Sequence, residues 1–107
     1  MHSIEWAAGL FEGEGSMTQD KRRNQSYQLV LRMTDKDVVE AFRDVVGYGN
    51  VVELHPPNHK KKGWSKFYSW TCCKRDQVRF ILGKLLPYFG NRRAYKALNI
   101  LDDLELA

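Results

Sequence analysis

The fold of this 107-residue chain is decided by the stretch Trp6-Ala7-Ala8-Gly9-Leu10-Phe11-Glu12-Gly13-Glu14-Gly15-Ser16. Its first half predicts a short helix from about Ile4 to Glu12, with Ser3 as a suitable N-cap residue. Its second half predicts the end of that helix, because Gly13 and Gly15 free the backbone to turn and Ser16 begins a strand-like run. A carboxylate, Glu14, stands between the two glycines.

Two acids, Glu12 and Glu14, would thus lie at the C-terminal end of a helix, where the helix dipole disfavours negative charge. A positive group should compensate them. A hard divalent cation with oxygen ligands would do so, and such a cation commonly also takes oxygens from substrate phosphates. The alternative is a solvated turn in which the glycines and glutamates have no partner.

The stretch from Ala7 to Gly15 resembles the nine-residue motif that defines the LAGLIDADG homing endonucleases. Four positions match it outright: Ala8, Gly9, Leu10 and Gly15. Phe11 replaces another apolar residue, Gly13 is a common variant, and Glu12 and Glu14 keep both acids. Ala7 departs from the usual leucine, a change that concerns helix packing and not chemistry.

Charge favours an anionic partner. The chain has 17 Lys and Arg against 13 Asp and Glu, for a formal net charge of +4, and a pI near 9.2. Three of the acids, Asp102, Asp103 and Glu105, follow the last base, Lys96, so the rest of the chain is more basic than the total indicates.

No apolar run approaches the ~18 residues needed to cross a bilayer, and the N-terminus lacks a basic region followed by an apolar core. We therefore expect a soluble, intracellular protein of the cytoplasm, nucleoid or an organelle, with no membrane partner.

Cys72 and Cys73 are adjacent, which is not the spacing of a redox or zinc motif, and their alternation predicts one thiol inside and one outside. We expect both to be reduced and structural. The histidines add no metal-ligand spacing to them, so the sequence does not indicate a zinc site.

Period-two alternation predicts four strands. Residues 16–21 and 27–33 would form a hairpin around a polar turn at 22–25, with Tyr27, Leu29, Leu31 and Met33 on the buried face. Residues 50–54 and 65–72 would form a second pair around a loop at 55–63. In the last strand, Tyr68, Trp70 and Cys72 share one face, and Phe67, Ser69 and Thr71 share the other.

Helical spacing predicts three further helices. Thr34 would cap the first, from Asp35 to Val46, which Gly47 and Gly49 would end. The second runs from Gln77 to Leu86 and is interrupted by Pro87. The last runs from about Asn91 to Leu104, with Ala94, Ala97, Leu98 and Leu101 as its apolar stripe. The order α-β-β-α-β-β-α-α predicts one α+β domain over residues 1–107, with a four-stranded antiparallel sheet covered by helices on one face.

The resemblance implies the same order, with the sheet curved into a saddle over double-stranded DNA. Family members carry either two motifs in one chain or one motif in a homodimer. The single motif here implies a homodimer whose first helices pack together at the two-fold axis. The expected interface residues are Ala8, Gly9, Glu12 and Gly13.

The resemblance also implies a catalytic site. The last acid of the motif, here Glu14, would bind a divalent metal ion, normally Mg²⁺, which activates a water and stabilises the charge on the phosphate. Two further catalytic positions correspond to Asp35 and to Arg92, with Arg93 as the substitute. Arginine cannot readily release a proton, so Arg92 would act as a fixed cation. The simpler alternatives are a helix-starting acid at Asp35 and an exposed cation at Arg92.

Sequence readout would come from the outer face of the sheet and the basic turns. The candidates are Thr18, Asp20, Arg22, Arg23, Asn24, Ser26, Gln28, Arg32, Ser69 and Thr71, with Lys60, Lys61 and Lys62 from the second loop as phosphate contacts. Arg32 suits guanine, and Gln28 or Asn24 suits adenine. On the third strand, either Val52 and Leu54 face outward, or the register is off by one and Val51 and Glu53 do. The lysine run has a simpler alternative too, as solvated surface.

The sequence therefore predicts a homodimeric, Mg²⁺-dependent, site-specific DNA endonuclease. A strand of about eight residues rises ~26 Å, so a dimer would cover a long, near-palindromic site. One alternative is a non-catalytic DNA-binding protein or RNA splicing cofactor (maturase-like) of the same fold. Another is a basic scaffold for a protein partner, which leaves the polar sheet face and Glu14 without a use.

Overall fold

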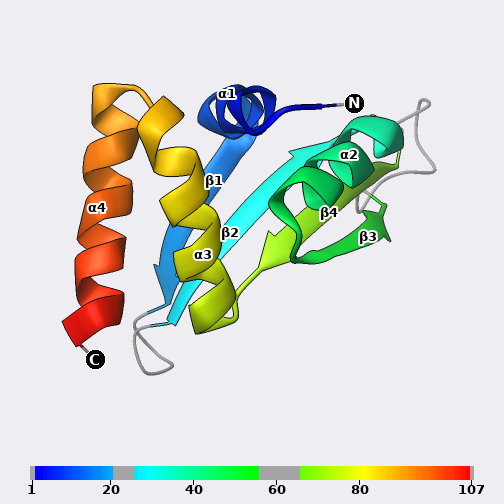
Figure 1. Cartoon of the computed structure of the whole chain (residues 1–107). Coiled ribbons are helices and arrows are strands. Elements are labelled where there is room, and N and C mark those ends of the chain that lie inside the picture. The colour runs from blue at the N-terminus through cyan, green and yellow to red at the C-terminus, as the bar shows by residue number, and fades with distance from the viewer. Residues whose placement is uncertain (1, 21–25, 56–65, 107) are drawn as a thin grey trace.

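The computed structural model describes residues 2–20, 26–55 and 66–106. Its elements follow the predicted order (Figure 1): α1 (Ile4–Glu14), β1 (Gly15–Asp20), β2 (Ser26–Met33), α2 (Lys36–Val46), β3 (Asn50–Leu54), β4 (Phe67–Cys72), α3 (Arg75–Leu85), the 3₁₀ turn η1 (Leu86–Tyr88) and α4 (Asn91–Leu106). The predicted α+β class and strand count are confirmed for the described residues.

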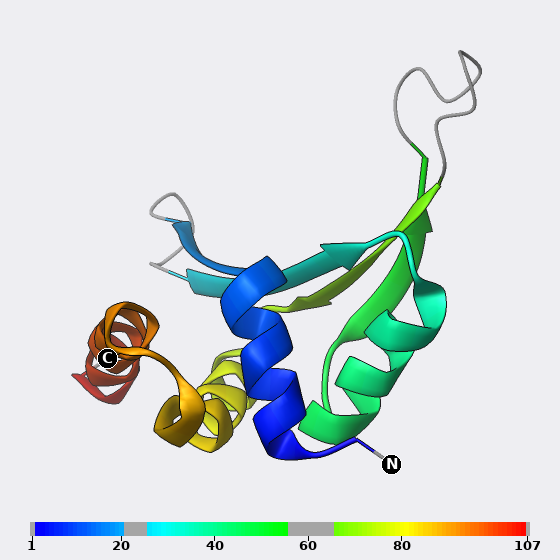
Figure 2. The same cartoon turned by 90° about the horizontal axis from the view of Figure 1, so that it is seen from above.

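The four strands form one antiparallel sheet in the order β1-β2-β4-β3. The sheet is curved, the helices lie on one side of it, and its other side is uncovered (Figure 2). Successive side chains along a strand alternate between the covered and the uncovered side of the sheet. Tyr27, Leu29 and Leu31 of β2 are buried under the helices, as predicted, whereas Gln28 and Arg32 are exposed on the uncovered side.

An aromatic core joins α1 to the sheet. Phe11 is fully buried, and its ring centroid lies 6.0 Å from that of Phe42, 6.2 Å from that of Phe89 and 6.4 Å from that of Trp70. Because these four residues come from α1, α2, the segment before α4 and β4, their packing fixes the end of α1 relative to the other elements.

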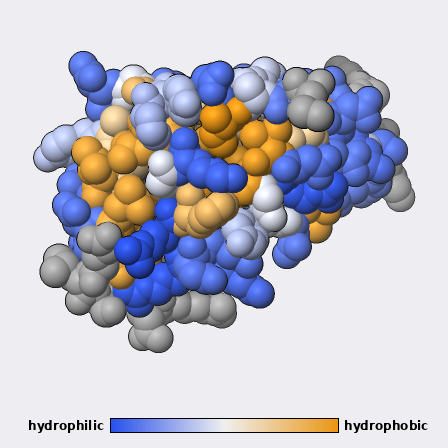
Figure 3. Space-filling model, in the orientation of Figure 1, coloured by the Kyte–Doolittle hydropathy of each residue, from blue (hydrophilic) through white to orange (hydrophobic). Residues whose placement is uncertain are grey.

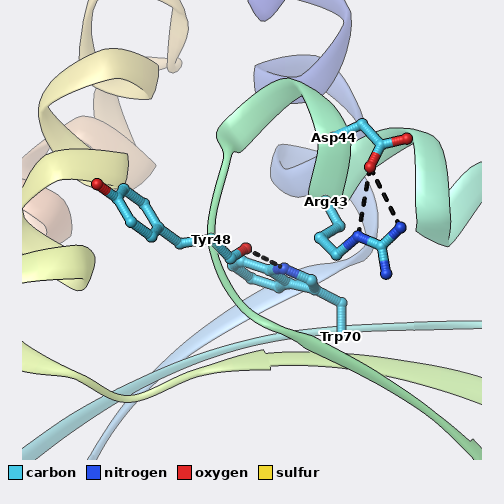
Figure 4. Close-up of polar contacts among 4 residues, drawn as sticks. All are labelled: Arg43, Asp44, Tyr48 and Trp70. Carbon is cyan, nitrogen blue, oxygen red and sulfur yellow. Dashed lines mark hydrogen bonds and ion pairs between the residues drawn. The ribbon is translucent and has the colours of Figure 1, made fainter.

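The turn from α2 to β3 is built around Trp70 (Figure 4). The indole Nε1 of Trp70 donates a 2.8 Å hydrogen bond to the carbonyl oxygen of Tyr48. Gly49 has a φ of 102°, and a Cβ there would lie 2.2 Å from Trp70 Nε1. Glycine is thus required at position 49 both by the backbone conformation and by the approach of the indole. The nearby pair of Arg43 and Asp44, 3.2 Å apart, is exposed.

The last helix is tied to the sheet and to α3. The Tyr27 hydroxyl, on β2, donates a hydrogen bond to the Asp103 carboxylate. Arg75 Nη2, at the start of α3, donates a 2.7 Å hydrogen bond to the carbonyl oxygen of Leu104.

One thiol lies inside and one outside, as predicted: Cys72 is buried and Cys73 is exposed. Neither forms a disulfide. Burial raises the pKa of the Cys72 thiol to about 11. Cys72 is therefore a protonated core group.

Among the described residues, no helix combines the length and the apolar character required to cross a membrane.

Several boundary or packing predictions are wrong, among them the helix predicted over 77–86, which runs from Arg75 to Leu85. The first helix continues through Gly13 to Glu14, and Gly15 already belongs to β1. Asp35 caps α2 in place of Thr34, because its carboxylate accepts a 3.1 Å hydrogen bond from the Asp37 amide. Leu98 is 47% exposed, since the buried stripe of α4 runs through Ala97 and Ile100.

Candidate nucleic-acid interface

The uncovered face of the sheet carries polar side chains in rows that the strand register aligns. Thr18 of β1 lies opposite Gln28 of β2, and both are exposed. A longer row crosses all four strands, through Ser16, Val30, Thr71 and Asn50. Because paired residues of antiparallel strands project to the same side, these rows form one surface of hydrogen-bonding groups that is interrupted by the apolar Val30.

The predicted readout residues are mostly on this surface. Thr18, Gln28 and Arg32 are exposed there, and Thr71 is half-buried. Ser69 is only 2% exposed, because it sits on the central strand β4 between Arg32 of β2 and Val52 of β3. Ser69 is therefore poorly placed for a ligand contact.

Sequence reasoning missed two exposed residues of the same surface, Ser16 and Asn50. Ser16 projects to the same side of the sheet as Thr18, and Asn50 projects to the same side as Val52. Thr18 and Val52 were both identified from the sequence. Extending the alternation to the first residue of each strand would have found them.

The register of β3 follows the first of the two predicted alternatives. Val52 is paired with Ser69 on the uncovered side and is 48% exposed, whereas Val51 is opposite the buried Trp70. Glu53 is opposite Tyr68 and accepts its hydroxyl at 3.2 Å. Partial burial opposes ionisation of Glu53, but the ammonium of Lys66, 3.5 Å away, and the Tyr68 hydroxyl outweigh it, so the pKa of Glu53 is lowered.

The predicted contacts in the two basic turns lie outside the described residues: Arg22, Arg23, Asn24, Lys60, Lys61 and Lys62. Asp20 and Ser26 are the last backbone pair of the β1–β2 ladder.

Glu14 is the last residue of α1 and directly precedes β1. Its side chain is exposed and makes no hydrogen bond or ion pair with any described residue. Since Ser16, two residues later, projects from the uncovered face, the free carboxylate lies at the start of the strand that carries the polar surface.

A guanidinium supplies positive charge at the end of α1. Arg93 Nη2 donates to the carbonyl oxygen of Glu12 at 2.7 Å, and Nη1 donates to that of Gly15 at 3.1 Å. The Glu12 carboxylate points to the start of α4, where it accepts the Gly90 amide at 2.9 and 3.0 Å. A cation thus meets the negative end of α1, and an anion meets the positive end of α4.

The other predicted catalytic residues are placed differently. The Asp35 carboxylate is engaged as the N-cap of α2, in agreement with the simpler alternative. Arg92 is exposed and lines a hollow of about 460 Å³ together with Glu12, Arg93 and Lys96. This hollow has three cationic side chains, and its one carboxylate is already bonded to Gly90.

The donor set suits a magnesium ion only in part. The described residues contain no group of three His, Cys, Asp or Glu side chains that could hold a metal. At the end of α1 the Glu12 carboxylate is bonded to the Gly90 amide, so Glu14 is the carboxylate that this end offers to a metal ion. Mg²⁺ is commonly bound by one or two carboxylates together with waters and substrate phosphates, so Glu14 fits a site that a nucleic acid completes.

The outward face of α1 is narrow and partly apolar. Gly9 and Gly13 are exposed, and a Cβ at either position would meet nothing within 4 Å. Trp6 and Leu10 are half-buried beside them. Figure 3 views the helix-covered side, where apolar patches alternate with hydrophilic ones. The predicted interface is wrong at Ala8. This residue is fully buried in the protomer's own core and cannot reach a partner.

No model of a known protein family matches the chain, and no curated protein matches it either. Solved structures do match. The homing endonuclease I-CvuI in complex with its target, in the presence of 2 mM Ca, is 16% identical with a TM-score of 0.74, over 95% of this chain and 65% of that one. I-CvuI has also been solved with a DNA target in the presence of 2 mM Mg.

Two further structures are similar. The archaeal intron-encoded homing endonuclease I-Vdi141I complexed with DNA is 17% identical, with a TM-score of 0.74 over 95% of this chain and 66% of that one. The LAGLIDADG homing endonuclease I-GzeII in complex with a DNA target is 19% identical, with a TM-score of 0.70 over 96% of this chain and 35% of that one. The chain has the LAGLIDADG homing endonuclease fold, and it spans about two thirds of the first two chains and a third of the last.

Proposed function

We propose that the chain is one protomer of a homodimeric, divalent-metal-dependent DNA endonuclease of the LAGLIDADG type, which cuts both strands of a long, near-palindromic site. The observation that carries this proposal is the exposed, unpartnered carboxylate of Glu14 at the edge of a polar, uncovered sheet face. A carboxylate in that position would repel DNA phosphates unless a cation lay between them. A protein that only binds DNA has no use for it.

Each part of the chain then has a distinct task. The uncovered face lies in the major groove, where Arg32 and Gln28 contact base edges and the hydroxyls of Ser16 and Thr18 add further hydrogen bonds. Glu14 would hold the metal ion. When bound, Mg²⁺ supplies Lewis-acid stabilisation of the phosphate and makes a water more acidic. Arg92 is a fixed cation beside the phosphate and does not transfer a proton.

Support for the homodimer comes from the two glycines of α1. A glycine inside a helix costs about 1 kcal/mol relative to alanine, and no described residue of the protomer lies close enough to require one at position 9 or 13. One exposed helical glycine does not identify an interface, since Gly83 of α3 is equally unobstructed. Gly9 and Gly13 differ because they lie one turn apart on one face, next to half-buried Trp6 and Leu10. A second α1 fits that face and would bring two Glu14 side chains together.

A selection from randomised DNA duplexes tests the proposal. The unmodified protein and the Glu14→Gln variant are each incubated with the library in Mg²⁺, and both the cut ends and the bound molecules are sequenced. We expect the unmodified protein alone to cut, at one near-palindromic site, and both proteins to enrich that site among bound molecules. Binding without cutting by the unmodified protein would contradict the endonuclease.

A second candidate is a DNA-binding protein of the same fold without nuclease activity. It is favoured by the engagement of Asp35 as a helix cap and of Arg93 with backbone carbonyls. Of the four predicted catalytic residues, only Glu14 and Arg92 then keep side chains that are not used in this way. Selective binding in the library without any cutting would support it, and the absence of DNA binding would move the search to RNA.

A further inference from the structure

We infer that Arg93 is a positioning residue for Glu14: its guanidinium fixes the backbone on both sides of the metal-binding carboxylate, and Glu12 holds α4 in the place from which Arg93 acts. This inference rests on the proposed function, because it assigns Arg93 a role in that same site.

The two hydrogen bonds of Arg93 bracket Glu14. One accepting carbonyl belongs to Glu12, two residues before it, and the other to Gly15, the residue after it. Both bonds come from the terminal nitrogens of one planar group, so the two carbonyls are held at a set separation. The helix end at Glu14 is thereby prevented from fraying, which is the usual behaviour of a last turn with unsatisfied carbonyls.

The guanidinium is itself held in place. It lies 5.7 Å from the centre of the Phe11 ring, and Phe11 is fully buried among aromatic neighbours. From the opposite direction, the Glu12 carboxylate accepts the Gly90 amide. Gly90 immediately precedes α4, and its carbonyl accepts the Ala94 amide at 2.9 Å. The start of α4 and the end of α1 therefore hold each other through two separate contacts.

This arrangement explains why a basic residue at the start of α4 is useful even where it does not touch the phosphate. A ligand carboxylate binds a metal well only when its own position is fixed, and loss of the groups that orient ligands typically weakens metal affinity or activity about 10- to 100-fold. Arg93 acts on Glu14 through the backbone, whereas Arg92, one residue earlier, is exposed and free to face the nucleic acid.

The test compares Arg93→Lys with Arg75→Lys. Lysine keeps the charge but cannot span two carbonyls as the planar guanidinium does. Arg75 is the matched control because it makes a similar arginine-to-carbonyl bond, to Leu104, at the other end of α4. Calorimetric titration of Ca²⁺ into each protein–DNA complex measures metal affinity, the Mg²⁺ dependence of cleavage measures it a second time, and thermal melting reports stability.

We expect Arg93→Lys to weaken Ca²⁺ binding and to raise the Mg²⁺ midpoint by about tenfold, with DNA affinity in EDTA unchanged. Arg75→Lys should alter melting and leave both metal readouts as in the unmodified protein. An unchanged metal affinity in Arg93→Lys would overturn the inference, as would an equal effect of both variants. If Arg93→Lys does not fold, Glu12→Gln, which keeps one acceptor for Gly90, should weaken Ca²⁺ binding in the same direction, and no change there would overturn it.

The proposed function fails separately, and the inference with it, if the unmodified protein neither cuts DNA nor binds Ca²⁺ in its DNA complex. If the unmodified protein does both and Arg93→Lys behaves identically, only the role of Arg93 is wrong.

Discussion

Gly15 lies directly against the ring of Phe11: a Cβ atom on Gly15 would be 2.3 Å from Phe11 Cδ1. The φ angle of Gly15 is −86°, which any residue can adopt. Glycine is needed there for space and not for backbone freedom. The contact joins the end of α1 to the start of β1, so it bears directly on where Glu14 lies.

We expect Gly15→Ala to lower the free energy of unfolding by about 1–3 kcal/mol, the usual cost of forcing extra atoms into a packed core. Phe11 cannot move aside easily, because Phe42, Phe89 and Trp70 surround it. Urea denaturation measures the change. Gly83→Ala is the control: position 83 is open, so alanine there should be neutral or slightly stabilising, and an equal loss in both variants would contradict the steric explanation.

Gly9→Leu separates protomer stability from dimer formation. Gly9 is exposed and has room for a Cβ atom, and leucine has a better helix propensity than glycine, so secondary structure should be retained. The same side chain would hold two α1 helices apart. We expect sedimentation equilibrium to show a dimer for the unmodified protein and for Gly83→Leu, and a monomer for Gly9→Leu. A Gly9→Leu dimer would locate the interface elsewhere.

The Tyr27 hydroxyl should make the free energy of unfolding depend on pH in the alkaline range. Burial, the hydrogen bond to Asp103 and the charge of that carboxylate raise the pKa of Tyr27 from 10.0 to about 12. Between those values the unfolded chain releases the proton that the folded protein keeps. The contribution of Tyr27 to the free energy of unfolding is therefore fully present below pH 10 and is lost as the pH rises toward 12.

The measurement is the free energy of unfolding of the unmodified protein and of Tyr27→Phe between pH 7 and pH 12. We expect Tyr27→Phe to be less stable by about 1 kcal/mol at pH 7, and the difference to shrink above pH 10. Tyr95, which is 71% exposed, provides the control through Tyr95→Phe. A difference that stays constant up to pH 12 would contradict the assigned pKa.

Arg32 should read a base, and the lysines at 60–62 should not. We expect Arg32→Ala to relax the preference at one position of each half-site, at a cost of about 1–3 kcal/mol for the preferred base. Replacing the three lysines with glutamine removes charge from a run identified by sequence alone, so it should weaken binding to all duplexes similarly and flatten the salt dependence. Binding selections at two salt concentrations distinguish the two effects, and a changed preference in the lysine variant would show that the run reads bases.

The strands were predictable from the sequence because their period of two is simple and local. Tyr27, Leu29 and Leu31 on one face, and Gln28 and Arg32 on the other, needed only alternation. Helix ends were less predictable. Gly13 indicated a stop, yet α1 continues through it to Glu14, where Arg93 binds the carbonyls of Glu12 and Gly15 on either side of the last residue.

Long-range contacts account for most of what the sequence did not predict. Arg93 lies about 80 residues from the carbonyls that it binds, and local propensity carries no information on that pairing. Ala8 was expected to face a partner because it is small, but smallness also suits close packing inside one protomer, and the 3.6-residue period alone did not separate Ala8 from Gly9.

Cleavage of the selected DNA site by the unmodified protein and by Glu14→Gln tests the central claim most directly. In Mg²⁺ under single-turnover conditions, we expect Glu14→Gln to cut at least about 100-fold more slowly. Without divalent ions it should bind the site as well as the unmodified protein or better, because one carboxylate no longer repels the phosphates. A Glu14→Gln variant that cuts at the rate of the unmodified protein would contradict the role of Glu14 and, with it, the account of this site.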